Sequence, residues 1–341
     1  MEKICIIYTG GTIGSAKSDK GINVNDKQKE ILIERFYENY EGEEVEFDEV
    51  SPITTLSENM TCEKWVSIVD CISEQLEKGY KGIVLTHGTD TLAYTACMVA
   101  FMFADCNIPI VLVSSNQPLG NPNANGHYNF MSAVQFIMTS GLRGVYVAYR
   151  DRYLNNNILL ATRCTQAMQI TGEVLSANGE PFGKMVDGYF RYNPKNNPTL
   201  QEVNNKKIIS PGKSNKFCNE FILIKPYVGM NYEFFHSKYR AKFILHELYH
   251  SGTACVEGGN NSLIEFSSYC KQNKIDLYLS PMDKNQNMYS SSVELQENKV
   301  KIIKGMSIEA TLVKLMIAYG SYSSSKIRET FLNQDLFFEY M

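Results

Sequence analysis

The sequence predicts an α/β protein of two domains, in which buried strands alternate with helices. Short apolar, β-branched runs such as Gly82–Thr86 end in glycine-containing turns, and apolar residues at helical spacing follow them. The chain has 341 residues, of which 44% are hydrophobic and 21% are charged, a composition typical of globular proteins. Because open α/β sheets bind ligands at the carboxyl ends of their strands, the turns after the strands are the first place to look for function.

The first two strand-to-turn units carry threonines. Strand 4–8 leads directly into Thr9-Gly10-Gly11-Thr12-Ile13-Gly14, where the glycines let the backbone approach a ligand closely. Strand 82–86 leads through His87-Gly88 to Thr89, at the expected N-cap of the next helix, and to Asp90. Two threonines at one sheet edge, one with an aspartate beside it, suggest a hydroxyl nucleophile and its partners. The alternative is that Thr89 only caps the helix and Asp90 only favours its first turn.

The remaining elements follow from the same patterns. Residues 16–25 are polar and read as a mobile loop, a possible lid over the first turn. In the first domain we expect further helices at 27–40, 62–76 and 127–140 and further strands at 45–49, 109–113 and 144–148. The first domain is expected to cover residues 1–195, a linker rich in Asn, Lys, Pro and Ser 196–216, and a smaller α/β domain 217–341. Within the second domain we expect strands at 221–225, 243–248 and 275–279 and helices at 263–273 and 308–319.

Charge and cysteine usage argue against several classes of protein. The net charge is −4, with 33 basic and 37 acidic residues and no long run of like charge, so neither nucleic acid nor a membrane surface is an expected partner. The nine cysteines are scattered and form no C-x-x-C pair, and we expect reduced thiols in a cytoplasmic protein. His246 and His250 have i, i+4 spacing but lie on a predicted strand and loop, so no metal or other cofactor is expected.

The sequences YTGGTIGS and THGTDTLAYTA resemble the two signature motifs of the bacterial-type L-asparaginases, and the resemblance to the cytosolic, type I-like members extends over nearly the whole chain. It implies a larger N-terminal parallel or mixed sheet flanked by helices and a smaller C-terminal α/β domain. It also implies hydrolysis of an amide through the nucleophile Thr12, assisted by Thr89 and Asp90. Ser57 and Glu58 stand where the family has its Ser-Gln or Ser-Ser pair, which holds the amino-acid end of the substrate; without the family, they read as a loop before a helix.

The resemblance implies further site residues and an assembly. The other implied substrate-binding residues are Gly11, Gly88 and Asn116. The family's smaller domain completes the site of a neighbouring subunit, which predicts a homodimer or homotetramer. Candidates for that role are Tyr249-His250-Ser251-Gly252 and Asp283.

Three positions depart from the family's pattern. Ile22 stands where a lid tyrosine is customary, Asn125 where an aspartate is customary, and Gln166 where the family has its catalytic lysine. An amide does not titrate, so Gln166 cannot relay a proton as an ammonium does. The sequence therefore leaves two functions open: an amidohydrolase acting on L-asparagine, or a protein of the same fold that binds an amino acid or related amide with little turnover.

Overall fold

The computed structural model describes residues 1–11, 15–18, 21–24, 27–206, 215–236, 241–285 and 287–341. For residues 15–18, 21–24 and 27–28, only the backbone is described. Thr12 lies outside the described residues. The chain divides into two compact units, Met1–Asn215 with Leu336–Phe338, and Lys216–Asp335 with Glu339–Met341. The expected linker, 196–216, stays a prediction, and helix α5 (Leu200–Asn205) lies within that range.

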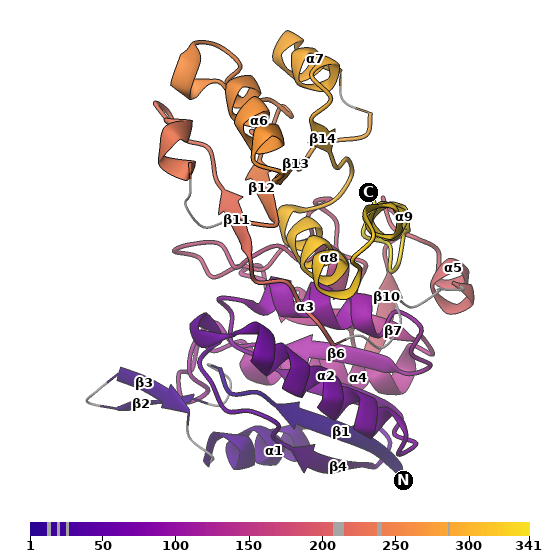
Figure 1. Ribbon diagram of the computed structural model, residues 1–341. Helices are drawn as coiled ribbons and strands as arrows, with labels where there is room; N and C mark the ends of the chain where they lie inside the picture. Colours follow the sequence, from indigo (N-terminus) through magenta and orange to yellow (C-terminus); the bar gives the residue numbers. More distant parts are fainter. Residues whose placement is uncertain (12–14, 19–20, 25–26, 207–214, 237–240, 286) are drawn as a thin grey trace. The chain divides into compact units, whose positions relative to one another are not determined.

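The first unit is built on an eight-stranded sheet in the order β10-β9-β8-β7-β6-β5-β1-β4 (Figure 1). Its parallel strands are β1 (Glu2–Tyr8), β4 (Val45–Val50), β5 (Gly82–Thr86), β6 (Pro109–Val113) and β7 (Gly144–Arg150). The antiparallel strands β8 (Asn156–Leu160), β9 (Gly183–Val186) and β10 (Tyr189–Tyr192) extend one edge. The prediction of a mixed sheet is confirmed.

Helices pack in pairs on this sheet. α1 (Lys27–Asn39) contacts α4 (Gly126–Thr139), and α2 (Cys62–Leu76) contacts α3 (Leu92–Met102). Every residue of β5 and β6 is buried, which explains why both strands read as continuous apolar runs instead of alternating ones. The sheet is therefore a rigid base for the turns that follow its strands.

The segment predicted as a mobile loop contains two short strands. β2 (Ser15–Ser18) pairs antiparallel with β3 (Gly21–Val24) and forms a separate two-stranded sheet. The prediction of a loop was therefore wrong for these residues. The loop was predicted from the polar composition of these residues. Backbone pairing in a two-stranded ribbon requires no apolar face, so composition does not reveal it.

The second unit contains a four-stranded parallel sheet in the order β11-β12-β13-β14. Its strands are β11 (Phe221–Ile224), β12 (Phe243–Glu247), β13 (Asp276–Ser280) and β14 (Lys301–Ile302). Its helices are α6 (Leu263–Gln272), α7 (Ser290–Glu297), α8 (Ile308–Ser321) and α9 (Ser325–Asn333). A buried cluster that includes Ile244, Phe266 and Leu279 forms its core, so the prediction of a smaller α/β layer is confirmed.

Candidate active site

The order of the strands in the first unit indicates where a ligand site is expected. β1 lies between β4 and β5, and the chain runs from β1 outward to β4 before it returns to β5 on the other side. The order of the strands therefore reverses between β1 and β5, which is the place where open α/β sheets bind ligands. Tyr8 and Thr86, the last residues of these two strands, are paired in register, so both turns start at the same level.

The two turns touch at glycines. Gly11 has φ +78°, and a Cβ placed on it would lie 2.2 Å from the backbone nitrogen of Gly88. A Cβ on Gly88 would lie 2.4 Å from the side-chain oxygen of Ser57. Glycine is required at both positions, since any side chain would separate the turn after β1, the turn after β5 and the turn that carries Ser57.

The turn that carries Ser57 is also hydrogen-bonded to the first turn. The Gly11 amide donates to the Thr55 carbonyl at 3.0 Å, and the Thr55 amide donates to the Thr9 carbonyl at 3.0 Å. These bonds continue the pairing of parallel strands beyond the end of β1, through a bridge between Gly10 and Thr55. Three segments distant in the sequence therefore form one site.

Ser57 and Asp90 meet directly within it. The Ser57 hydroxyl lies 3.3 Å from Asp90 Oδ2 and accepts from the Asp90 amide at 3.3 Å. The Thr91 hydroxyl donates to the Ser57 carbonyl at 2.8 Å. Ser57 is buried, whereas Asp90 is exposed and has no ion pair with another described residue. A hydroxyl is thus held against a carboxylate that faces solvent.

One expectation about this turn was wrong. The N-cap of α3 is Thr91, two residues beyond Thr89, and Thr91 makes no side-chain capping bond. The helix begins late because Thr91 is bonded to the Ser57 turn instead. Thr89 is therefore not the N-cap of α3 and lies half-buried in the irregular turn before the helix, and its catalytic role stays a prediction.

Glu58 and Gln166 lie at the exposed side of the site. Glu58 follows Ser57 in the short 3₁₀ helix η2 (Ser57–Asn59), and its carboxylate makes no ion pair with another described residue. Gln166 comes from the segment after β8, and its side-chain amide donates to the Asp90 carbonyl at 3.4 Å. Gln166 is exposed. The structure thus brings Ser57, Asp90 and Gln166 together.

His87 is a residue of this site that the sequence patterns did not single out. It is completely buried, and Nδ1 lies 2.8 Å from the Gly88 carbonyl. Burial lowers the pKa of His87 to about 4, so the ring is neutral near pH 7. Its position between a buried strand and Gly88 is the only sequence signal, and a neutral ring there serves to hold Gly88 in place.

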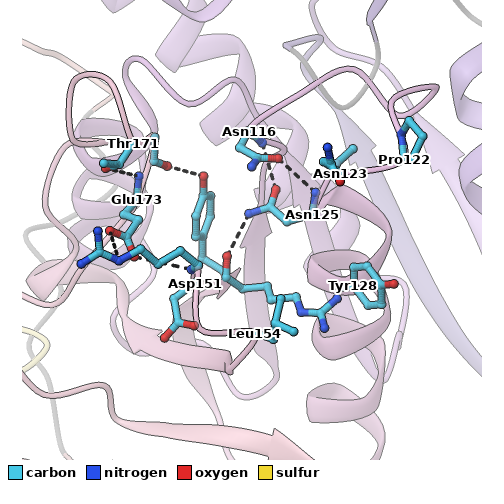
Figure 2. Close-up of a pocket in the computed structure, with 14 residues that line it drawn as sticks. Asn116, Pro122, Asn123, Asn125, Tyr128, Asp151, Leu154, Thr171 and Glu173 are labelled. Atoms are coloured by element: carbon cyan, nitrogen blue, oxygen red, sulfur yellow. Dashed lines mark hydrogen bonds and ion pairs between the residues drawn. The ribbon is translucent and has the colours of Figure 1, made fainter.

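Asn116 lines a cavity at the carboxyl ends of β6 and β7. This cavity has a volume of about 390 Å³ and is shown in Figure 2. Its wall includes the Arg150 guanidinium, 3.7 Å from the Tyr128 ring centre, and Glu173, which pairs with Arg152 at 3.4 Å. Within the described ranges, Asn116 is hydrogen-bonded to Asn125 and not to Ser57 or Asp90. Substrate binding by Asn116 therefore stays a prediction.

Asn125 has a structural reason for being an amide. Its Oδ1 accepts from the Asn116 amide at 2.9 Å, while its Nδ2 donates to the Arg150 carbonyl at 2.9 Å (Figure 2). The side chain is 7% exposed. An ionised aspartate would place a carboxylate oxygen against the Arg150 carbonyl, because a carboxylate has no N–H to donate.

We expect Asn125→Asp to lower the free energy of unfolding by about 1–3 kcal/mol at pH 7, since one buried bond becomes a repulsive contact. Burial and the facing carbonyl should raise the pKa of the new carboxyl above its unfolded value. The loss should then shrink as the pH falls below that raised pKa, where a protonated carboxyl donates to Arg150 O. Urea unfolding from pH 4 to 8 measures this, and a loss that does not depend on pH would contradict it. Asn123→Asp, at an exposed neighbour, is the control.

The candidates in the second unit lie after two of its strands. Tyr249-His250-Ser251-Gly252 form a turn after β12, closed by the Gly252 amide donating to the Tyr249 carbonyl at 2.8 Å. Asp283 follows β13 and accepts from the Asn285 amide at 2.7 Å. Both lie at the carboxyl edge of their own sheet, and a role in a neighbouring subunit stays a prediction.

Two features are missing from the described residues. No group of three or more His, Cys, Asp or Glu side chains in that part of the chain is arranged to hold a metal ion. Among the helices described, none has both the length and the hydropathy to span a bilayer.

The fold and the site together define an α/β protein with a hydroxyl-and-carboxylate site at its topological switch point. Comparison with known proteins gives its family: the profile "Asparaginase, N-terminal" matches residues 3–197, and the chain belongs to the asparaginase family. The structure is similar to the thermostable L-asparaginase from Thermococcus kodakarensis, with a TM-score of 0.79 and 24% identity, covering 99% of each chain. It is similar to L-asparaginase I from Vibrio cholerae, with a TM-score of 0.79 and 22% identity, over 100% of this chain and 99% of that one.

Two of the curated relatives have names that describe different reactions. A glutamyl-tRNA(Gln) amidotransferase subunit of Methanococcus vannielii is 27% identical over 94% of this chain and 75% of its own length. The L-asparaginase of Thermococcus kodakarensis is 35% identical over 48% of this chain and 47% of its own length. The relatives therefore agree on the family but differ in the reaction that their names describe.

Proposed function

We propose that this protein hydrolyses the side-chain amide of L-asparagine to aspartate and ammonia, with Thr12 as nucleophile. The observation that supports this best is the meeting of three turns at the β1/β5 switch point, where Ser57 and Asp90 are hydrogen-bonded and Gly11 and Gly88 are in contact. Thr12 is the residue that follows Gly11 in the sequence. The proposed protein is a cytoplasmic homodimer or homotetramer that needs no cofactor and binds neither nucleic acid nor membrane by itself.

In the proposed reaction, the Thr12 hydroxyl attacks the carboxamide carbon, and its proton passes towards Asp90 with Thr89 orienting the groups. Backbone N–H groups of the turns stabilise the negative charge that forms on the carbonyl oxygen. The C–N bond then breaks, and the NH2 group leaves as ammonia after it takes up the proton that Thr12 released. Water hydrolyses the resulting threonine ester, which releases aspartate and restores the hydroxyl.

One carboxylate supports an amino-acid substrate. Glu58 is exposed beside Ser57 and has no ion pair with another described residue, so it is available to an ammonium group. The hydrogen bond of a carboxylate to an ammonium is charge-assisted and stronger than a neutral one. This arrangement fits the α-ammonium of asparagine.

We expect Glu58→Gln to weaken asparagine binding by about 1.5–3 kcal/mol, the range for hydrogen bonds to charged groups. An amide without an α-amino group, such as succinamic acid, should bind equally to both proteins. Calorimetry with the two ligands measures the difference. Glu58 is only structural if both ligands weaken alike, and Glu77→Gln, just beyond the end of α2, is the control.

The direct test of the proposed function is ammonia release from a panel of amides: L-asparagine, D-asparagine, L-glutamine and succinamic acid. We expect turnover of L-asparagine to exceed that of the others. Release from glutamine alone would move the proposal to another amide. Binding of asparagine without any release would favour the alternative, a binding protein with little turnover, for which Gln166 beside Asp90 is the supporting observation.

A second candidate function comes from the relatives that match along nearly the whole chain. Several are named as a subunit of a glutamyl-tRNA(Gln) amidotransferase, at 27% identity in one case and 29% in another. In that role, this chain would release ammonia from an amide for use by another protein. A chain that turns over asparagine rapidly by itself would argue against this dependence, whereas turnover that appears only with a partner would favour it.

A further inference from the structure

Lys64 makes two hydrogen bonds across the turn that carries Ser57 and Glu58. Its ammonium donates to the Thr55 hydroxyl at 2.8 Å and to the Asn59 carbonyl at 2.7 Å. Thr55 and Asn59 flank the two predicted substrate-binding residues on either side. The lysine therefore bridges the start and the end of the turn 55–59.

The backbone of Lys64 is itself fixed. Thr61 is the N-cap of α2, and its side chain accepts from the Lys64 amide at 3.4 Å. Lys64 is half-buried and forms no ion pair of 4 Å or less with a carboxylate among the described residues. A lysine on a helix surface is usually solvated or paired with an acid. An ammonium that instead donates to a hydroxyl and a backbone carbonyl indicates that Lys64 positions the turn 55–59.

Thr55 links this bridge to residues 9–11, the turn after β1. We call it the nucleophile turn because Thr12 follows it in the sequence. The Thr55 carbonyl accepts from the Gly11 amide, and the Thr55 amide donates to the Thr9 carbonyl. A Cβ on Gly10 would lie 2.3 Å from the Thr55 carbonyl oxygen, so the two segments are in close contact. A shift of Thr55 would thus move Gly10 and Gly11 on one side and Ser57 on the other.

We propose that Lys64 is a positioning residue that holds the substrate-binding turn 55–59 against the nucleophile turn 9–11. It touches neither the substrate nor the reacting atoms, and acts through Thr55 and Asn59. This inference rests on the proposed function for its kinetic part only.

The kinetic test compares Lys64→Met, which keeps the length and loses the donors, with Lys64→Arg, which keeps a cation. We expect Lys64→Met to lower kcat/KM for L-asparagine by about 10- to 100-fold, with KM raised and kcat lowered. Lys64→Arg should recover most of this loss. The matched control is Lys78→Met beyond the end of the same helix, where Lys78 pairs with Glu74 at 3.6 Å on the surface. Lys78→Met should leave kcat/KM within about twofold.

A double-mutant cycle tests the route through Thr55. Thr55→Val removes the hydroxyl that accepts from Lys64 and keeps the shape of the side chain. If Lys64 acts through this hydroxyl, then adding Thr55→Val to Lys64→Met should cost less than the same change in the wild type. Full additivity of the two changes would overturn this route.

Native-state hydrogen exchange tests the proposal without any activity. We expect the Gly11 and Thr55 amides to exchange at least about tenfold faster in Lys64→Met, since the two turns open more often. The Val84 amide in buried β5 should keep its rate, and Lys78→Met should change none of the three.

The outcomes separate this inference from the proposed function. Unchanged exchange at Gly11 and Thr55 overturns it, whatever the activity. Faster exchange with unchanged KM and kcat also overturns it, because Lys64 is then a structural residue only. If the wild type releases no ammonia from any amide, the proposed function fails, and the exchange rates still decide whether Lys64 holds the two turns together.

Discussion

Thr12→Ala is expected to abolish ammonia release from L-asparagine, with kcat lowered by at least about 10⁴-fold, as in other enzymes that lose a covalent nucleophile. The variant keeps the turns that bind the substrate, because Gly11 remains against Gly88 and the Gly11 amide remains bonded to Thr55. Asparagine should therefore bind within about tenfold of the wild-type affinity, since one neutral hydroxyl contact contributes about 0.5–1.5 kcal/mol. Ammonia release and calorimetry on the same preparations measure the two effects.

Thr330→Ala is the control for this prediction. Thr330 is an exposed threonine on α9, and its hydroxyl is bonded to the Lys326 carbonyl within the same helix. We expect wild-type kinetics from it. Equal ammonia release from the wild type and from Thr12→Ala would remove Thr12 from the mechanism, and loss of both binding and turnover would point to a damaged turn.

Gln166→Lys distinguishes the two candidate functions, an amidohydrolase and a binding protein with little turnover. The Gln166 side-chain amide donates to the Asp90 backbone carbonyl, and both residues are exposed, so a lysine at this position would lie close to Asp90. If turnover is limited by the missing proton relay, we expect kcat to rise by about 10²–10⁴-fold, the contribution typical of a general acid–base group. A lysine acts as a base only when it is neutral, so the gained activity should rise with pH. Asp90 should raise the pKa of the lysine and move this rise to higher pH.

The measurement is kcat and kcat/KM for asparagine from pH 6 to 9, with Gln169→Lys as control because Gln169 is an exposed neighbour in the same segment. An inactive wild type made active by Gln166→Lys supports the binding protein. If the wild type is active and Gln166→Lys leaves kcat unchanged or lowers it, the result supports an enzyme in which another group relays the proton. If both proteins bind asparagine and release no ammonia, the absent lysine is not the reason, and the absent tyrosine at Ile22 is the next residue to test.

Local patterns determined much of the architecture. The strand predicted at 109–113 has those bounds in the structure, and the strand at 82–86 does as well. Both are fully buried apolar runs bounded by residues that end strands, so their bounds are visible in the local sequence without knowledge of the strands that they pair with. The sequence also predicted that Gly10 and Gly11 allow a close approach of the backbone, and in the structure both have positive φ and lie against backbone atoms of neighbouring turns.

Local patterns failed where tertiary contacts compete with them. Thr89 has a good N-cap side chain at the expected place, yet α3 begins at Leu92 because the turn before it is bonded to Ser57. The antiparallel extension β8-β9-β10 was missed, since its last two strands have only four residues each and their pairing is not visible in one strand alone. Polar residues 15–24 likewise hid a two-stranded ribbon.

The sequence by itself predicted the parts of the candidate site: two glycine-containing turns with threonines, a Ser-Glu pair and an amide at Gln166. Only the tertiary structure decided that β1 lies between β4 and β5, so that the turns after β1 and β5 meet where the strand order reverses. It also decided that Ser57 contacts Asp90, 33 residues away, and that Lys64 bridges Thr55 and Asn59. The physical reason is that periodicity records which face of an element is buried, whereas strand order and side-chain contacts depend on the packing of the whole sheet.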